Sequence, residues 1–209
     1  MKYHNAVKIF FLSLVISILL CTGAWATPYS YGGHYYDVIR AAGITWDDAR
    51  AAALGSYYSG LEGHLVTITS DDENNAVHAM ILASGIPEGS GEMWAGGYQN
   101  PIDEAVPTAG WTWVNGEGSF PGVTTPSPHY ANWSGGEPND AYGTASEQHL
   151  GLNWGTGWND EAHLPFIYGY VIEYDPNTIN DVSVPEPATM LLLGLGLMGL
   201  AGVRRKLRK

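Results

Sequence analysis

Three carboxylates and two side-chain amides lie close together near the carboxyl end of the chain. They are Glu137, Asn139, Glu147, Asn159 and Asp160. Their oxygen atoms make a hard donor set, which favours Ca²⁺ over zinc or copper. If the fold brings the five side chains together, they form a cation site with room for a ligand. Taken alone, however, an Asn-Asp pair is also typical of a turn.

The middle of the chain is strongly acidic. Residues 27–183 contain two basic and 20 acidic residues, a formal charge of −18. Such a surface repels a phosphate backbone, so we expect no nucleic-acid partner. The charge also suits cation binding, although the solubility of an exported protein explains most of it. No arrangement of Ser, His and Asp and no pair of carboxylates stands in a catalytic context, so we expect no enzymatic activity.

The first 26 residues have the organisation of a secretory signal peptide. Two lysines precede an apolar core at residues 9–20, and a small-x-small cleavage pattern follows at residues 24–26. The only cysteine, Cys21, lies inside this segment, so the mature chain has no thiol for disulfides or metal binding. A lipoprotein signal is the alternative, but Leu20 stands where such a signal has a small residue.

Residues 181–209 form a second, three-part signal. Pro-Glu-Pro at residues 185–187 precedes an uncharged, mostly apolar stretch at residues 188–203 and a basic tail. As a helix this stretch reaches about 24 Å, short of the roughly 30 Å hydrocarbon core. This end resembles the PEP-CTERM sorting signal of Gram-negative bacteria, which implies transient membrane anchoring, processing by an exosortase, and delivery to the envelope or extracellular matrix. A plain membrane anchor is the alternative.

Residues 27–180 are predicted to form one α+β domain. A helix is expected to begin at Thr45 and to continue through residues 49–54, and a capping box at residues 70–73 predicts a second helix that stops at Gly85. The back half is richer in glycine, proline and tryptophan. The strands that we expect cover residues 64–68, 93–95, 111–114, 149–152 and 166–174.

Eight short motifs occur in a characteristic order. They are Thr-Trp-Asp-Asp-Ala-Arg at 45–50, Gly-His-Leu-Val-Thr-Ile at 63–68, Trp-Ala-Gly-Gly at 94–97, Trp-Thr-Trp at 111–113, Asn-Trp at 132–133, Glu-Pro-Asn at 137–139, Trp-Asn-Asp at 158–160 and Gly-Tyr-Val-Ile-Glu-Tyr at 169–174. Together they resemble a C-type lectin domain over about residues 32–175. The resemblance implies a C-type lectin-like fold with two short helices, two small antiparallel sheets and a long calcium-binding loop.

The resemblance also implies roles for the five polar residues as metal and ligand-binding groups. In that family the bond between Glu137 and Pro138 is cis, and the backbone carbonyl of Asp160 is a sixth ligand. Ca²⁺ accepts six to eight ligands, so about two positions remain for vicinal sugar hydroxyls. The Glu-Pro-Asn order is associated with mannose, glucose and N-acetylglucosamine. Asp140, with Glu147, could contribute to an accessory calcium site.

This chain departs from the family pattern because it lacks both usual disulfides. The first pair of cysteine positions falls at Ala53 and Ile172, which can pack together without a bond. The second falls at His149 and His163, which we expect to face each other beside the calcium loop. Packed histidines are the main interpretation of this second pair, and a transition-metal site is the alternative. Five tryptophans at family core positions are expected to be buried: Trp94, Trp111, Trp113, Trp133 and Trp158.

These patterns together predict a secreted, calcium-dependent carbohydrate-binding protein. We expect it to be associated with the envelope or matrix and to act in exopolysaccharide or surface adhesion. The alternative is a lectin-like protein-binding or structural matrix module whose calcium is only structural.

Overall fold

The computed structural model describes residues 27–102, 104–126 and 128–176. The predicted signal peptide and the predicted sorting signal, with its apolar stretch at 188–203, therefore lie outside the described residues. Within the described ranges, no helix is long and apolar enough to cross a membrane.

Two helices begin at the residues that their capping patterns predict. Helix α2 spans Trp46–Leu54, and Thr45 Oγ1 accepts a hydrogen bond from the Asp48 backbone N–H at 3.1 Å. Helix α3 spans Asp71–Ala83, and Ser70 Oγ accepts from the Glu73 backbone N–H at 3.2 Å. Each cap satisfies a backbone donor that has no partner inside its helix. Both predicted helix starts are confirmed.

The strands form one mixed sheet. They are β1 (Tyr29–Tyr31), β2 (His34–Arg40), β3 (Tyr57–Tyr58), β4 (Leu61–Leu65), β5 (Glu92–Gln99), β6 (Trp111–Trp113), β7 (His149–Trp154), β8 (Gly157–Glu161) and β9 (Ile167–Tyr174). Their order is β1-β2-β9-β5-β7-β8, with β4 beside β9, β6 beside β5 and β3 beside β4. Pairing is antiparallel except between β5 and β9, which are parallel. The α+β class is confirmed, and this parallel contact joins the two antiparallel sheets that we expected.

The two helices contribute to different hydrophobic clusters of this sheet. On β9, Tyr170, Ile172 and Tyr174 belong to the cluster with α2, whereas Val171 belongs to the cluster with α3. On β5, Trp94 belongs to the cluster with α2, whereas Met93 and Ala95 on either side of it belong to the cluster with α3. Side chains alternate between faces along a strand. The central strands are therefore buried on both faces.

An aromatic cluster anchors the start of β8. The Trp158 ring is fully buried, and its indole N–H donates to Asn74 Oδ1 on α3 at 2.7 Å. Its centroid lies 5.8 Å from that of Trp113 and 5.9 Å from that of Trp133. The five tryptophans predicted to be buried are all in the core. The backbone immediately after Trp158, which carries Asn159 and Asp160, is thereby fixed in place.

The positions that lack the usual disulfides are filled in two ways. Ala53 and Ile172 are fully buried in one cluster, as predicted. His149 and His163, in contrast, pack against different rings. His149 stacks on Trp46 with centroids 4.4 Å apart, whereas His163 stacks on Tyr142 at 5.3 Å. The expectation that the two imidazoles face each other is not supported, because each has its own aromatic partner.

A network of polar side chains on β2, α3 and β9 also stabilises the fold. His34 Nδ1 lies 2.5 Å from Glu173 Oε1, and Tyr36 donates to Glu73 Oε1 at 2.8 Å. The second oxygen of Glu173 accepts from the backbone N–H and the hydroxyl of Thr67. The hydrogen bond to Glu173 raises the pKa of His34 from 6.5 to about 9, against the opposing effect of burial.

We expect His34→Ala to destabilise the protein by about 1 kcal/mol at neutral pH, because the imidazolium ion pair with Glu173 is partly exposed to solvent. Since the folded-state pKa is raised, this contribution is complete below about pH 6.5 and is lost as the pH rises through about 9. Urea unfolding of the variant and of the exposed control His129→Ala over this range measures it. A pH-independent difference would contradict the ion pair.

Candidate cation and ligand site

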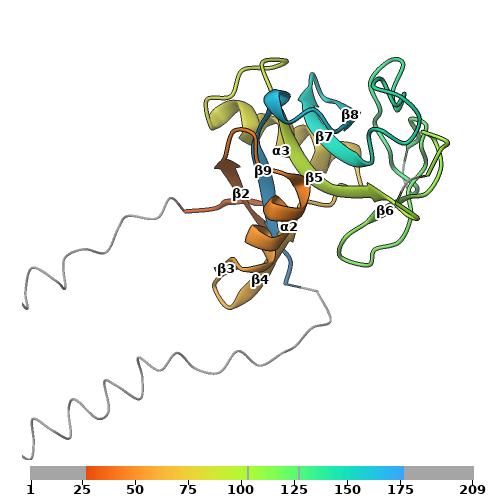
Figure 1. The fold of residues 1–209 in the computed structure, drawn as a ribbon. Coiled ribbons are helices and arrows are strands. Elements are labelled where there is room, and N and C mark those ends of the chain that lie inside the picture. The colour runs from red at the N-terminus through yellow and green to blue at the C-terminus, as the bar shows by residue number, and fades with distance from the viewer. Residues whose placement is uncertain (1–26, 103, 127, 177–209) are drawn as a thin grey trace, which may run out of the picture.

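Four of the five predicted ligands surround one cavity at the ends of β5, β7 and β8. The cavity has a volume of about 160 Å³, and Glu137, Asn139, Glu147 and Asn159 are among its lining residues. Asn159 comes from β8, whereas the others come from the long segment between β6 and β7. In Figure 1 the loops of this segment gather beside β7 and β8. Residues that are 22 positions apart in the sequence, such as Glu137 and Asn159, thus share one cavity.

The fifth predicted ligand, Asp160, lies just behind this cavity. Its side chain is fully buried and accepts hydrogen bonds from the backbone N–H groups of Asn139 and Asp140, both at 2.9 Å. These bonds fasten the Glu137–Asn139 turn to β8. A carboxylate oxygen has more than one lone pair, so these bonds leave acceptor capacity for a cation. The peptide bond between Glu137 and Pro138 is cis, as the resemblance implies.

Asp140 organises the loop that leads to Glu147. Its carboxylate accepts from the backbone N–H of Ala145 at 3.1 Å and from that of Glu147 at 3.0 Å. Glu147 in turn accepts a short hydrogen bond from the Ala141 backbone N–H. Both Asp140 oxygens therefore hold the loop backbone, and an accessory calcium ion at this residue stays a prediction.

Two of the predicted ligands, Glu137 and Glu147, have raised pKa values. Burial and the neighbouring Asp160 raise the pKa of Glu137 from 4.5 to about 7. Burial also raises the pKa of Glu147 to about 7, although its hydrogen bond from Ala141 opposes the shift. Such shifts arise where negative groups lose water and approach each other without a positive partner. A bound cation would supply that missing charge.

The donor set fits a calcium ion. Four side chains at the cavity offer hard oxygen atoms, and Glu137 Oε2 is buried without a hydrogen-bond partner among the described residues. An unpaired buried carboxylate oxygen is costly, and a metal ion would satisfy it. Neutral amide oxygens from Asn139 and Asn159 would complete the set. Ca²⁺ accepts carboxylate oxygens and amide oxygens as ligands.

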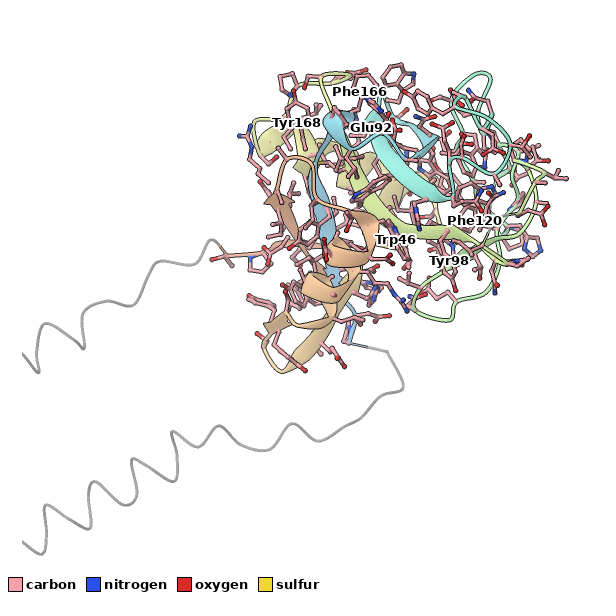
Figure 2. All side chains as sticks on the ribbon, viewed as in Figure 1. Trp46, Glu92, Tyr98, Phe120, Phe166 and Tyr168 are labelled. Atoms are coloured by element: carbon pink, nitrogen blue, oxygen red, sulfur yellow. The ribbon has the colours of Figure 1, made fainter. Side chains whose placement is uncertain are left out.

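Sequence reasoning missed half of the cavity wall. Two further carboxylates, Glu92 on β5 and Glu161 on β8, line it, as do the aromatic residues Tyr142, Trp154 and Phe166. Figure 2 shows Glu92 and Phe166 at the same end of the molecule. Glu161 directly follows the Trp-Asn-Asp motif, so its position could have been noticed. No local sequence pattern distinguishes Glu92, the first residue of β5.

The described residues contain a tighter cluster of ionisable groups elsewhere. Ligand atoms of His34, Glu73 and Glu173 lie within 4.8 Å of one another, a spacing that no three carboxylates of the cavity reach. The oxygens of these two glutamates already accept hydrogen bonds from neighbouring protein groups. We therefore place the candidate cation site at the cavity, where unpaired oxygens remain and where amides supplement the carboxylates.

Comparisons with known proteins agree with both halves of the sequence interpretation. Residues 183–206 match the PEP-CTERM protein-sorting motif, which indicates export with a membrane-anchored sorting signal. Over 151 residues, 69% of this chain, the sequence is 32% identical to Halomucin from Haloquadratum walsbyi. The chain spans about 1% of the length of that relative.

Solved structures show which fold this is. The C-type lectin CEL-I from Cucumaria echinata superposes with a TM-score of 0.54 at 21% identity, covering 74% of this chain and 99% of that one. The carbohydrate-recognition domain of cow CD23, determined in the presence of a GlcNAc2Man3 oligosaccharide, gives 0.52 at 21% identity, covering 73% and 96%. The chain has the C-type lectin fold, which it shares with a C-type lectin and with a C-type carbohydrate-recognition domain.

Proposed function

We propose that this protein is an exported, calcium-dependent carbohydrate-binding protein of the cell envelope or extracellular matrix. Its ligand would be an exopolysaccharide or surface glycan with mannose, glucose or N-acetylglucosamine type hydroxyls. Residues 1–26 would direct secretion, residues 27–180 would bind the glycan, and residues 181–209 would be processed by an exosortase after transient membrane anchoring.

The observation that carries this proposal is the convergence of Glu137, Asn139, Glu147 and Asn159 on one cavity. Calcium would be held by these four side chains together with Asp160. It would polarise and position two neighbouring hydroxyl groups of a sugar. The glutamates of this set could accept hydrogen bonds from the hydroxyls and the amides could donate to them. Sugars whose hydroxyls point in other directions would leave buried polar groups without partners and would bind poorly.

Chelator-sensitive retention tests the proposal. We expect the full chain to be retained on immobilised mannose or N-acetylglucosamine in calcium and to be released by EDTA. Asn159→Ala should abolish retention, because it removes a cation ligand and a hydroxyl partner together. The control Glu62→Gln changes an exposed acidic residue on β4 and should leave retention intact.

The same experiment separates the lectin from a matrix module with structural calcium. A protein that binds calcium and is stabilised by it, but is retained on no monosaccharide resin, would contradict sugar binding. Adhesion that survives Asn159→Ala would then favour the structural module. Isothermal titration with calcium alone establishes whether the ion binds in either case.

A further inference from the structure

Two carboxylates of the cavity have no part in the proposed calcium site. Glu92 and Glu161 line the same cavity as the predicted ligands, and both residues are at most 3% exposed. The rings of Trp154 and Phe166 complete this side of the cavity, and each residue is more than half exposed. We call these four residues the acidic-aromatic wall.

The sheet is built so that this wall can form. Asn159 and Glu161 are two residues apart on β8, so their side chains leave the strand on one face, and both reach the cavity. Glu92 lies on β5, two strands away, and its carboxylate passes over Gly151 of β7. A Cβ atom on Gly151 would lie 2.0 Å from Glu92 Oε2. The glycine therefore leaves the space that brings Glu92 to the cavity.

One oxygen of this wall has no partner. Glu92 Oε1 accepts from the Asn159 side-chain amide at 3.1 Å, but Oε2 is buried without a hydrogen bond among the described residues. Glu161 Oε1 accepts from the backbone N–H groups of Ala162 and His163. The wall thus has acceptor capacity and lacks positive charge.

Neither arginine of the described residues supplies this charge. Arg40 donates to the Ser84 carbonyl, and the Arg50 guanidinium lies over the Trp46 ring at 5.7 Å. They are the two basic residues of the segment 27–183. A cationic group of a ligand would fit this wall.

We propose that the acidic-aromatic wall is a subsite for the protonated amine of an amino sugar, beside the proposed calcium position. The inference rests on the proposed function and names its ligand class: a glycan that contains glucosamine with a free amine. An ammonium group donates three hydrogen bonds, which suits Glu92 Oε2 and the Glu161 carboxylate. Aromatic rings attract organic cations and stack on sugar faces.

Binding of matched oligosaccharides tests the subsite. The full chain is titrated, in calcium at neutral pH, with a glucosamine oligomer and with its fully N-acetylated counterpart. We expect the amine form to bind at least about tenfold more tightly, because its bonds to the carboxylates are charge-assisted. Glu161→Gln and Glu92→Gln should each bring this ratio towards one. Glu62→Gln, the same charge change on exposed β4, should preserve it.

Gly151→Ala provides a second test that changes no charge. It should displace the Glu92 carboxylate and lower the same ratio. Equal binding of the two forms by the unaltered protein, or a preference that survives both glutamate substitutions, would overturn the subsite while leaving calcium-dependent sugar binding intact. Equilibrium dialysis that finds a second calcium ion, lost in Glu161→Gln, would also overturn it. If neither form binds although calcium does, the proposed function fails and the subsite fails with it.

Discussion

Asp160→Asn is expected to weaken calcium binding at least about 100-fold and to destabilise the calcium-free protein by about 2 kcal/mol. The buried carboxylate accepts the backbone N–H groups of Asn139 and Asp140. An asparagine whose oxygen takes the place of Oδ2 can still accept from both N–H groups, but its amino group then takes the place of Oδ1, which lies 2.9 Å from the Asn139 nitrogen. Two donors would face each other at a buried position. The turn that carries Glu137 and Asn139 would then separate from β8.

Glu137→Gln is the matched comparison. It also removes a proposed calcium ligand, and we expect a similar loss of calcium affinity. The calcium-free protein, however, should be as stable as the unaltered one or more stable above about pH 7. The reason is that burial and Asp160 disfavour the charged form of Glu137, raising its pKa to about 7.

Calcium titration by calorimetry and urea unfolding in EDTA measure the two effects separately. Equal destabilisation of the calcium-free protein by both substitutions would contradict the distinct role of Asp160, which is to hold the Glu137–Asn139 turn against β8 by hydrogen bonds. If Asp160→Asn binds calcium as tightly as the unaltered protein, Asp160 is not a calcium ligand.

Local signals in the sequence were sufficient for the helices and for much of the core. The caps at Thr45 and Ser70 depend on residues three positions away, so their spacing is visible in the sequence. The buried tryptophans follow from their places in the motifs. Strands β1 and β2 were not predicted, since β1 is exposed throughout and β2 is mostly half-buried. Neither strand has a clear apolar alternation.

The cavity shows the limit of such reasoning. Its motif residues could be assigned because Glu-Pro-Asn and Trp-Asn-Asp are contiguous, but the rest of the wall depends on contacts between distant segments. Glu92 reaches Asn159 from 67 positions away, across a strand whose glycine leaves room. The pair of His34 and Glu173 is separated by 139 positions. Sheet order and register determine these contacts, and no local spacing encodes them.

Raising the pH is expected to weaken the calcium-free protein and to tighten calcium binding. The folded-state pKa values of Glu137 and Glu147 are raised to about 7, and that of Glu92 to about 8, from an ordinary value of 4.5. The folded protein thus holds protons that the unfolded chain releases. For these groups, stability is greatest below about pH 4.5 and falls as the pH rises to about 8.

Calcium reverses this trend because it replaces the protons. At a concentration 100 times its dissociation constant, a ligand that binds only the folded state adds about 2.7 kcal/mol. We therefore expect the stabilisation by calcium to be small at about pH 5 and to increase by about 2 kcal/mol towards pH 8. Thermal unfolding in calcium and in EDTA across this range measures the difference.

Glu137→Gln provides the control for this linkage. It should flatten the pH dependence of the EDTA curve and remove most of the difference between calcium and EDTA. A calcium-free protein that gains stability from about pH 5 to pH 8 would contradict the raised pKa values. A calcium effect of constant size over the same range would place the ion away from these carboxylates, because an ion bound among them must compete with their protons.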